Sequence, residues 1–289
     1  MRKEDLRIIA MLVDDIFNKI SLDRRALEMT TEFFIEEKKR AGLSPSDLYY
    51  IGMADTASWW WCGRQSILAN KKMEFDFFLA HLSDRIEYSM ILGYLPVESR
   101  PLEDIVSRLP ELEWEDIEHV LKIKSGDLQR MPDEGDLLAL MHGGTDARRE
   151  GVRAHHRIAE RYPTIRWAFK WRDFMISGVP DGITDNFVYE FKTTKNRFLL
   201  NYMKPVAFTQ ADLYAHFFRR PMKRVQIYLR ETGEILTWME AADEENARST
   251  LEKFREAVRE NKAPKMPANW KCRKCEFMQE CISSFVDKP

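Results

Sequence analysis

The four cysteines of this 289-residue chain constrain its fold more than any other feature. Cys272, Cys275 and Cys281 lie close together near the end of the sequence, whereas Cys62 lies far upstream in T-A-S-W-W-W-C-G-R. A C-x-x-C spacing brings two thiolates to one metal centre, and the two remaining cysteines can complete a four-thiolate site. Zinc and an iron–sulfur cluster both accept four thiolates, and four free buried cysteines are the alternative. A four-thiolate site would hold distant parts of the chain together.

Length and composition predict a globular protein, either one large domain or one domain with an elaborated end. No segment reaches the ~20 consecutive apolar residues that a membrane span requires. The first residues, M-R-K-E-D-L-R, lack the apolar core of a signal peptide. We therefore expect a cytoplasmic protein without membrane association, whose cysteines bind a metal or cluster rather than form disulfides.

The formal net charge of −2 conceals an uneven charge distribution. Residues 145–230 carry 17 lysines and arginines against 8 aspartates and glutamates, a balance of +9, whereas residues 1–144 have a balance of −9. A local positive field favours an anionic polymer as partner. Solvated helix faces are the alternative explanation.

The pattern of apolar residues changes near residue 145. Helical spacing predicts helices over 4–20, 23–41, 56–70, 74–92 and 115–124, and later over 145–162, 204–219 and 242–261. Strands are predicted over 164–172, 174–180, 186–194, 224–230 and 235–240. This order indicates a helical region, then a core that alternates helices and strands, then a cysteine-rich tail.

A predicted hairpin over 176–192 carries acidic and basic residues in a pattern suited to metal-dependent phosphodiester cleavage. Asp181 lies at its turn, and Glu190 and Lys192 share one face of the second strand because they are two residues apart. Phe191 between them points to the other face. Carboxylates can bind a divalent metal that activates water, and a lysine can orient that water or stabilise the transition state. The alternative is an ordinary amphipathic hairpin with solvated charges.

Polar residues on the flanking helices could contribute to the same site. His155 could supply a nitrogen ligand, whereas the adjacent His156 diverges from it by about 100° around a helix. Gln210 and Tyr214 are four residues apart and therefore share a helix face, although a tyrosine there could equally belong to the core. Trp59–Trp61 could stack nucleic-acid bases, but three consecutive side chains cannot all face one groove.

These motifs, in this order, resemble those of the RecB-like branch of the PD-(D/E)XK nucleases. They are most similar to its iron–sulfur members, which are the CRISPR-associated Cas-four exonucleases, the AddB nuclease domain and exonuclease V. The matching residues are Gly151 and His155, Gly178 to Asp181, Glu190 to Lys192, Gln210 with Tyr214, and Cys62 with Cys272, Cys275 and Cys281. C-G-R stands where the family usually has C-P-R, and the stretch between Cys62 and Gly151 is long for the family.

The resemblance implies an α/β fold with a restriction-endonuclease-like core, in which helices flank a mixed central sheet. It implies an N-terminal helical extension over 1–50, a helical region with the first cluster cysteine over 51–144, the nuclease core over 145–261 and a cluster-binding tail over 262–289.

The resemblance also implies roles for the site residues. His155, Asp181, Glu190 and the Phe191 carbonyl would bind Mg²⁺ or Mn²⁺, and Lys192 would assist the attacking water. Gln210 and Tyr214 would position DNA or the lysine. The four cysteines would hold a structural [4Fe–4S] cluster rather than zinc.

The function we expect is metal-dependent hydrolysis of DNA, most simply exonucleolytic digestion of single-stranded ends. Partners would then be DNA and the proteins of CRISPR adaptation or recombination. One alternative is a non-catalytic DNA-binding or assembly subunit that keeps the cluster. Another is a zinc-stabilised protein whose hairpin acids are merely solvated.

Overall fold

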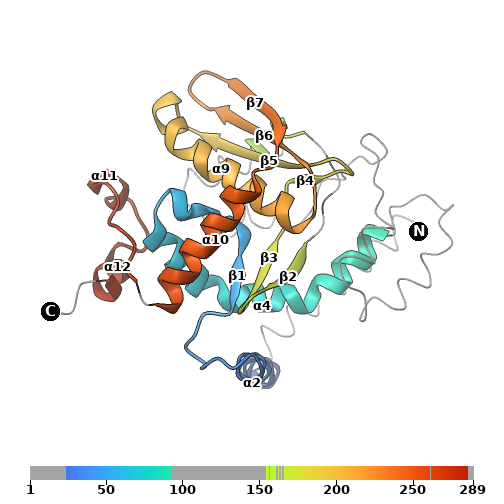
Figure 1. Cartoon of the computed structure of the whole chain (residues 1–289), viewed down its shortest axis with the longest axis vertical. Helices are drawn as coiled ribbons and strands as arrows, with labels where there is room; N and C mark the ends of the chain where they lie inside the picture. The colour runs from blue at the N-terminus through green and yellow to red at the C-terminus, as the bar shows by residue number, and fades with distance from the viewer. Residues whose placement is uncertain are drawn as a thin grey trace. The chain divides into compact units, whose positions relative to one another are not determined.

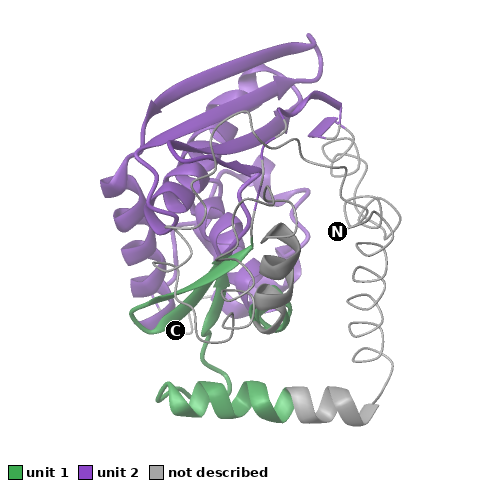
Figure 2. Cartoon of the chain, turned by 90° about the vertical axis from the view of Figure 1, so that its right-hand side faces the viewer, with its two compact units in different colours: residues 1–51, 73–120, 166–177 green, residues 52–72, 121–165, 178–289 purple. Residues whose placement is uncertain are grey.

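The structure of this protein is a computed structural model that describes residues 24–92, 154–155, 157–160, 162, 164, 166–260 and 262–285 (Figure 1). The helices expected over 4–20 and 115–124, together with Gly151 and His156, lie outside the described residues. The chain forms two compact units, each built from separate segments (Figure 2). The first comprises residues 1–51, 73–120 and 166–177, and the second comprises 52–72, 121–165 and 178–289.

The first unit is built on aromatic side chains. It contains α2 (Arg24–Arg40), the later part of α4 (Gly63–Leu92) and most of a sheet ordered β1 (Tyr50–Gly52), β3 (Phe174–Gly178) and β2 (Trp167–Trp171). Tyr50 and Phe78 are fully buried and pack edge to face at 5.2 Å. The buried Lys38 ammonium pairs with Glu74 at 2.8 Å, and the other Glu74 oxygen accepts the N–H of Tyr49. This buried charge is therefore compensated, as its burial requires.

The second unit contains a four-stranded mixed sheet in the order β4 (Gly182–Ile183), β5 (Phe187–Thr194), β6 (Met222–Leu229) and β7 (Glu234–Ala241). β5 and β6 are parallel, whereas the outer two pairs are antiparallel. A parallel pair needs a crossover connection, and α9 (Arg197–Phe217) supplies it. α10 (Glu244–Arg259) packs on α9, and both helices lie on the same side of the sheet (Figure 1).

Successive side chains of β5 point to opposite faces of the sheet, and the two faces have different surroundings. Phe187, Tyr189 and Phe191 pack against the segment that contains Ala154 and Ile158. The residues between them point to the opposite face, which α9 covers. That second face carries Glu190 and Lys192, as the sequence predicted.

Short elements complete the second unit. α3 (Met53–Ala57) and the 3₁₀ helix η1 (Ser58–Trp60) precede α4 and pack on α9. α11 (Asn269–Cys272) and α12 (Met278–Phe285) form the cysteine-rich tail.

The predicted α/β class with a mixed sheet is confirmed, and so are the helices over 23–41 and 242–261, to within a few residues. Three predictions of element boundaries were wrong. The helices predicted over 56–70 and 74–92 are α3, η1 and one continuous α4, because no helix-breaking residue interrupts 64–92. The helix predicted from 204 begins at Arg197, because the Asn196 side chain caps it by accepting the N–H of Leu199 at 3.2 Å. The strand predicted over 164–172 is confined to Trp167–Trp171.

No helix among the described residues is long and apolar enough to cross a membrane.

Candidate active site and cysteine pocket

Asp181 links the turn before β4 to two neighbouring segments. Its Oδ2 accepts the backbone N–H of Phe191 at 2.7 Å, and its Oδ1 lies 3.1 Å from His155 Nε2. Burial favours the neutral carboxyl, but the contact with His155 and the charge of Lys192 outweigh it and lower the pKa of Asp181. The carboxylate is therefore held in its charged form, with the imidazole at its edge.

Glu190 is completely buried on the α9 side of β5. Its Oε1 forms an ion pair with Lys192 Nζ at 2.5 Å. Apart from that pair, neither Glu190 oxygen has a hydrogen-bond partner among the described residues. Burial raises the pKa of Glu190 to about 8 even though the Lys192 charge opposes this. A buried carboxylate with unsatisfied oxygens is costly, and a bound cation would compensate it.

Lys192 stays cationic in this setting. Burial alone would lower its pKa, but the charges of Glu190 and Asp181 prevail and raise the pKa of Lys192. Its side chain retains 27% of its exposure, whereas Glu190 has none. Of this pair, the Lys192 side chain is thus the one with exposed surface.

Gln210 and Tyr214 lie side by side on α9, as their spacing predicted. Gln210 Nε2 donates to Tyr214 Oη at 3.0 Å, and both side chains are buried. Burial, together with the charges of Glu190 and Asp181, raises the pKa of Tyr214 well above its ordinary value. The phenol therefore remains protonated within the electrostatic field of the two carboxylates.

Asp55 is a site residue that the sequence reading missed. It lies in the first turn of α3, and its charge contributes to raising the pKa of both Lys192 and Tyr214. The M-A-D-T-A sequence seven residues before Cys62 gives no local sign of this role. Asp55 interacts electrostatically with Lys192 of β5 because α3 packs on α9.

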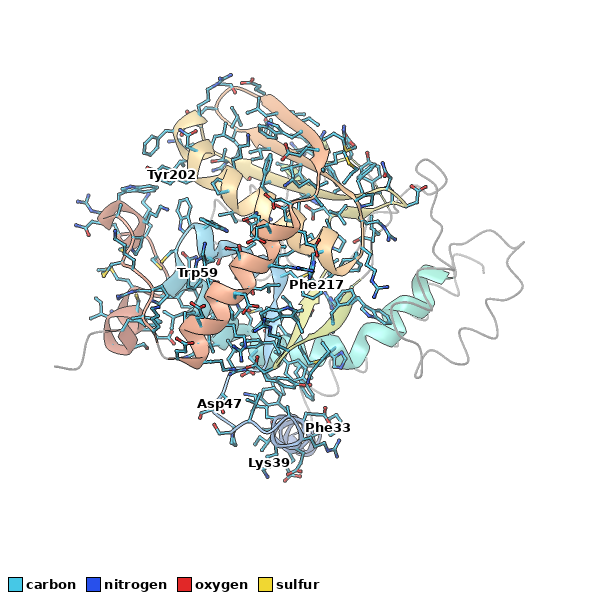
Figure 3. The ribbon with its side chains drawn as sticks, viewed as in Figure 1. Phe33, Lys39, Asp47, Trp59, Tyr202 and Phe217 are labelled. Carbon is cyan, nitrogen blue, oxygen red and sulfur yellow. The ribbon has the colours of Figure 1, made fainter. Side chains whose placement is uncertain are left out.

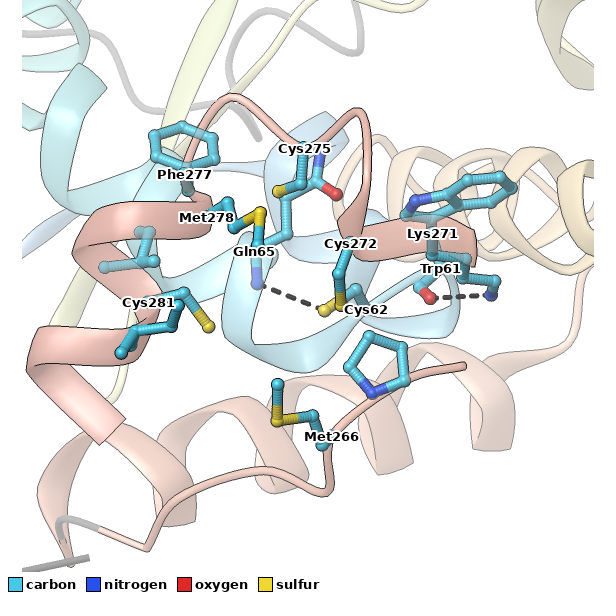
Figure 4. Close-up of a pocket in the computed structure, with 13 residues that line it drawn as sticks. Trp61, Cys62, Gln65, Met266, Lys271, Cys272, Cys275, Phe277, Met278 and Cys281 are labelled. Atoms are coloured by element: carbon cyan, nitrogen blue, oxygen red, sulfur yellow. Dashed lines mark hydrogen bonds between the residues drawn. The ribbon is translucent and has the colours of Figure 1, made fainter. Parts of the chain in front are cut away.

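The four cysteines line one cavity of about 50 Å³ (Figure 4). Cys62 lies just before α4, Cys272 ends α11, Cys275 follows in a turn, and Cys281 is on α12. Burial raises the pKa of Cys275, and the charges of the other three thiolates raise it further. The rest of the lining is mainly apolar, with Trp61, Phe277 and Met278 among its residues.

Contacts around the cavity connect segments that are distant in the sequence. Lys271 Nζ donates to the Trp61 carbonyl at 2.8 Å, and Arg64 Nε donates to the Pro264 carbonyl at 2.8 Å. A Cβ on Gly63 would lie 2.8 Å from Pro264 Cβ, so glycine is needed in the C-G-R sequence. The predicted convergence of Cys62 with the tail is therefore present in the fold.

The three consecutive tryptophans do not share one set of contacts: Trp59 and Trp60 contact α10, whereas Trp61 contacts α9. Trp59 packs edge to face on Phe254 of α10 (Figure 3), and Trp60 Nε1 donates to Thr250 at 2.9 Å. Trp61 instead packs against Tyr202 at 6.3 Å.

Metal binding stays a prediction. Among the residues that the structure describes, no group of three or more histidine, cysteine, aspartate or glutamate side chains is arranged closely enough to hold a metal ion.

Comparisons with known proteins add little. No family model matches the chain, and no curated protein matches it. The crystal structure of SSO0001 is one of nine solved chains that match. It has a TM-score of 0.36 and 14% sequence identity, over 90% of this chain and 96% of that chain. A likeness this weak carries no argument, so function has to be argued from the residues of this chain.

Proposed function

We propose that this protein is a metal-dependent DNA nuclease with a restriction-endonuclease-like core. The observation that carries the proposal is the buried Glu190 carboxylate, whose oxygens lack hydrogen-bond partners other than the Lys192 ion pair among the described residues. Asp181 and His155 meet at the neighbouring turn. Perturbed ionisable groups gathered in this way are typical of functional sites.

The chemical types of these donors suit a divalent cation, which would have to draw them closer together than they lie in this structure. The ligands would be the carboxylates of Asp181 and Glu190, the His155 imidazole and the Phe191 carbonyl, and hard oxygen donors suit Mg²⁺ or Mn²⁺. When bound, such an ion lowers the pKa of a water molecule and neutralises charge that develops on a phosphate.

The protein's own residues would orient the reactants. Lys192, held cationic and partly exposed, would donate to a phosphate oxygen or to the attacking water. Gln210 and the protonated Tyr214 would fix the position of the substrate or of Lys192.

We propose that the cysteine pocket holds a structural cluster, which would draw the four thiolates closer together than they lie in this structure. Four sulfurs line one small, largely apolar cavity, and that donor set suits [4Fe–4S] or zinc. We favour [4Fe–4S], in line with the resemblance to the iron–sulfur nucleases. Purified protein should then contain iron and absorb broadly in the visible range, whereas zinc alone would contradict this assignment.

The test of the function is digestion of end-labelled single- and double-stranded DNA with Mg²⁺, Mn²⁺ or EDTA. The parent should release label only with metal, and Lys192→Met or Asp181→Asn should reduce the rate by at least about 10²-fold. Lys39→Met, at an exposed lysine of α2, is the matched control and should cleave like the parent. Equal melting temperatures would show that the variants are folded.

Two outcomes would contradict the proposal. Cleavage by Lys192→Met at the parental rate would show that the site is wrongly assigned. If the cluster-loaded parent binds DNA but cleaves neither substrate, the protein is instead a non-catalytic binding subunit.

A further inference from the structure

Four aromatic rings pack together outside the candidate active site, and three of them surround one lysine. We call this group the aromatic–lysine surface, and it consists of Trp61, Phe198, Tyr202, Trp270 and Lys271. Lys271 Nζ lies 4.4 Å from the centroid of the Trp61 ring, 4.6 Å from that of Tyr202 and 5.7 Å from that of Trp270. Each distance is within the range of a cation–π interaction.

The rings contact one another and come from three separate parts of the chain. Tyr202 projects from α9 (Figure 3) and meets Trp270 of α11 at 5.2 Å. Phe198, one turn earlier on α9, lies 5.5 Å from Tyr202 and 5.9 Å from Trp270. Trp61 is 5.7 Å from Trp270. Such mutual packing fixes the ring planes before any ligand arrives.

The outer rings are unusually exposed for their size. Phe198 retains 60% of its accessible area and Trp270 retains 37%. Large exposed apolar side chains that lie together mark interaction sites more often than isolated ones do. Trp61 and Lys271 also line the cysteine cavity, but Phe198 and Tyr202 do not. Shielding of the cysteines therefore does not account for the outer part of the surface.

The charges around the rings indicate an anionic ligand. Arg273 and Lys274 come two and three residues after Lys271 and are exposed. Arg197, next to Phe198, is 71% exposed and forms an ion pair with Glu234 at 2.9 Å. Interfaces with other proteins are usually depleted of lysine at their centre, whereas aromatic rings interleaved with basic residues are the pattern of single-strand binding surfaces.

α9 connects this surface to the candidate active site. Tyr202 precedes Gln210 by eight residues, which at the helical rise corresponds to about 12 Å along the axis. We propose that the aromatic–lysine surface binds single-stranded DNA ahead of the cleavage site, with bases stacked on Phe198 and Trp270 and phosphates at the adjacent basic residues. This inference rests on the proposed function because it takes DNA as the ligand. It does not require that the protein cleave the DNA.

Binding in EDTA tests the inference without cleavage. Fluorescence anisotropy would follow a labelled thymidine oligonucleotide of about 16 nucleotides. The double variant Phe198→Ala/Trp270→Ala should bind at least about 30-fold more weakly, because base stacking contributes about 1–3 kcal/mol per base and two stacking rings are lost. Phe198→Ala alone, at the most exposed ring, should lose part of the affinity, and Phe198→Trp should retain it.

Two controls distinguish a loss of base stacking from a loss of phosphate binding and from misfolding of the variant. An abasic oligonucleotide of the same length keeps the phosphates, so parent and double variant should bind it equally weakly. Trp60→Ala changes an exposed tryptophan that faces α10 instead, and it should bind the thymidine oligonucleotide like the parent. Equal melting temperatures would confirm that the variants are folded.

The outcomes distinguish this inference from the proposed function. Parental affinity in the Phe198→Ala and double variants would overturn the stacking surface, even if the protein cleaves DNA. Equal binding of abasic and normal strands by the parent would also overturn it. If the parent binds through these rings but cleaves nothing, this inference stands and the nuclease proposal fails. Loss of self-association instead of DNA binding in the double variant would identify a second copy of the chain as the occupant and overturn it.

Discussion

At Gly178 the end of β3 passes so close to α3 and α9 that only a hydrogen atom fits. A Cβ at this position would lie 2.6 Å from Met53 Sδ and 2.7 Å from Tyr214 Cε1. The absence of a side chain at Gly178 thus lets the Tyr214 ring pack against the β3 backbone, close to the carboxylates. The G-x-x-D pattern that carries part of the family resemblance has a physical reason here.

Gly178→Ala should therefore destabilise the protein and disturb the site together. Overpacking of this kind costs about 1–3 kcal/mol, to be measured by urea unfolding. The proposed nuclease activity should fall more than the unfolded fraction explains, because the Tyr214 ring must move. Combining Gly178→Ala with Met53→Ala should cost less than the sum of the two changes. Strict additivity would show that the predicted clash does not occur.

At the scale of elements, one carboxylate joins the segment 154–160 to the sheet. Glu160 accepts hydrogen bonds from Arg224 and Gln226 of β6 and from the Tyr162 hydroxyl, and its own N–H donates to Tyr189 Oη at 2.9 Å. The Arg224 contact is the largest cause of a lowered pKa at Glu160. Since this segment also carries His155, the network positions a predicted metal ligand.

The lowered pKa of Glu160 predicts a pH-dependent contribution to stability. Because the unfolded chain binds this proton more tightly, the contribution is present above the ordinary pKa of 4.5 and is lost as the pH falls through the lower folded value. Glu160→Gln should cost about 1–2 kcal/mol near neutral pH, since the pair is partly screened by solvent.

Chemical denaturation of the parent and of Glu160→Gln at a series of acidic pH values would measure this contribution of Glu160 to stability. The difference in free energy of unfolding should narrow as the pH drops below the ordinary value. Glu231→Gln, in a more exposed ion pair, is the control and should show little difference at any pH. If the difference in free energy of unfolding between parent and Glu160→Gln is the same at every pH, the charge of this carboxylate does not contribute to stability.

Many of the helices and strands could be predicted because their patterns of apolar and polar residues lie within short runs of sequence. The alternation of β5 and the amphipathic spacing of α10 are visible in a few consecutive residues. β1 and β4 were missed because they are short and depend on pairing with distant strands. The start of α9 was missed because the cap at Asn196 was overlooked in favour of Pro205, which instead lies within the helix.

At the scale of the whole molecule, the cysteine pocket connects residues that are far apart in the sequence. Cys62 and Cys281 line one cavity, and surrounding contacts such as Lys72 with Glu276 at 3.2 Å reinforce the junction. Spacing predicted that the three tail cysteines would lie together, whereas Cys62 was added as the one remaining cysteine and through the resemblance to the iron–sulfur nucleases. The aromatic–lysine surface and the role of Asp55 could not be predicted in the same way, because both depend on side-chain packing between separate segments.

Cys275→Ala should lose the proposed cluster and, with it, stability. A group that binds only the folded state at ~100 times its Kd adds about 2.7 kcal/mol, and this would be lost. Iron content, visible absorption and the melting temperature of anaerobically prepared protein are the measurements. Met278→Leu changes the cavity lining without removing a thiolate, so it should keep iron and colour. A stable and coloured Cys275→Ala protein would show that the cysteines do not act as a structural staple.

The alternation of β5 also limits how this strand can change during evolution. It is paired on both sides, with β4 and with β6, so its register is fixed along its length. Deleting a single residue would turn Glu190 toward the aromatic core and Tyr189 toward α9. Substitutions that preserve the character of each face can accumulate gradually, whereas insertions and deletions within the strand should be purged. Length variation among any descendants of this chain should therefore fall outside residues 187–194.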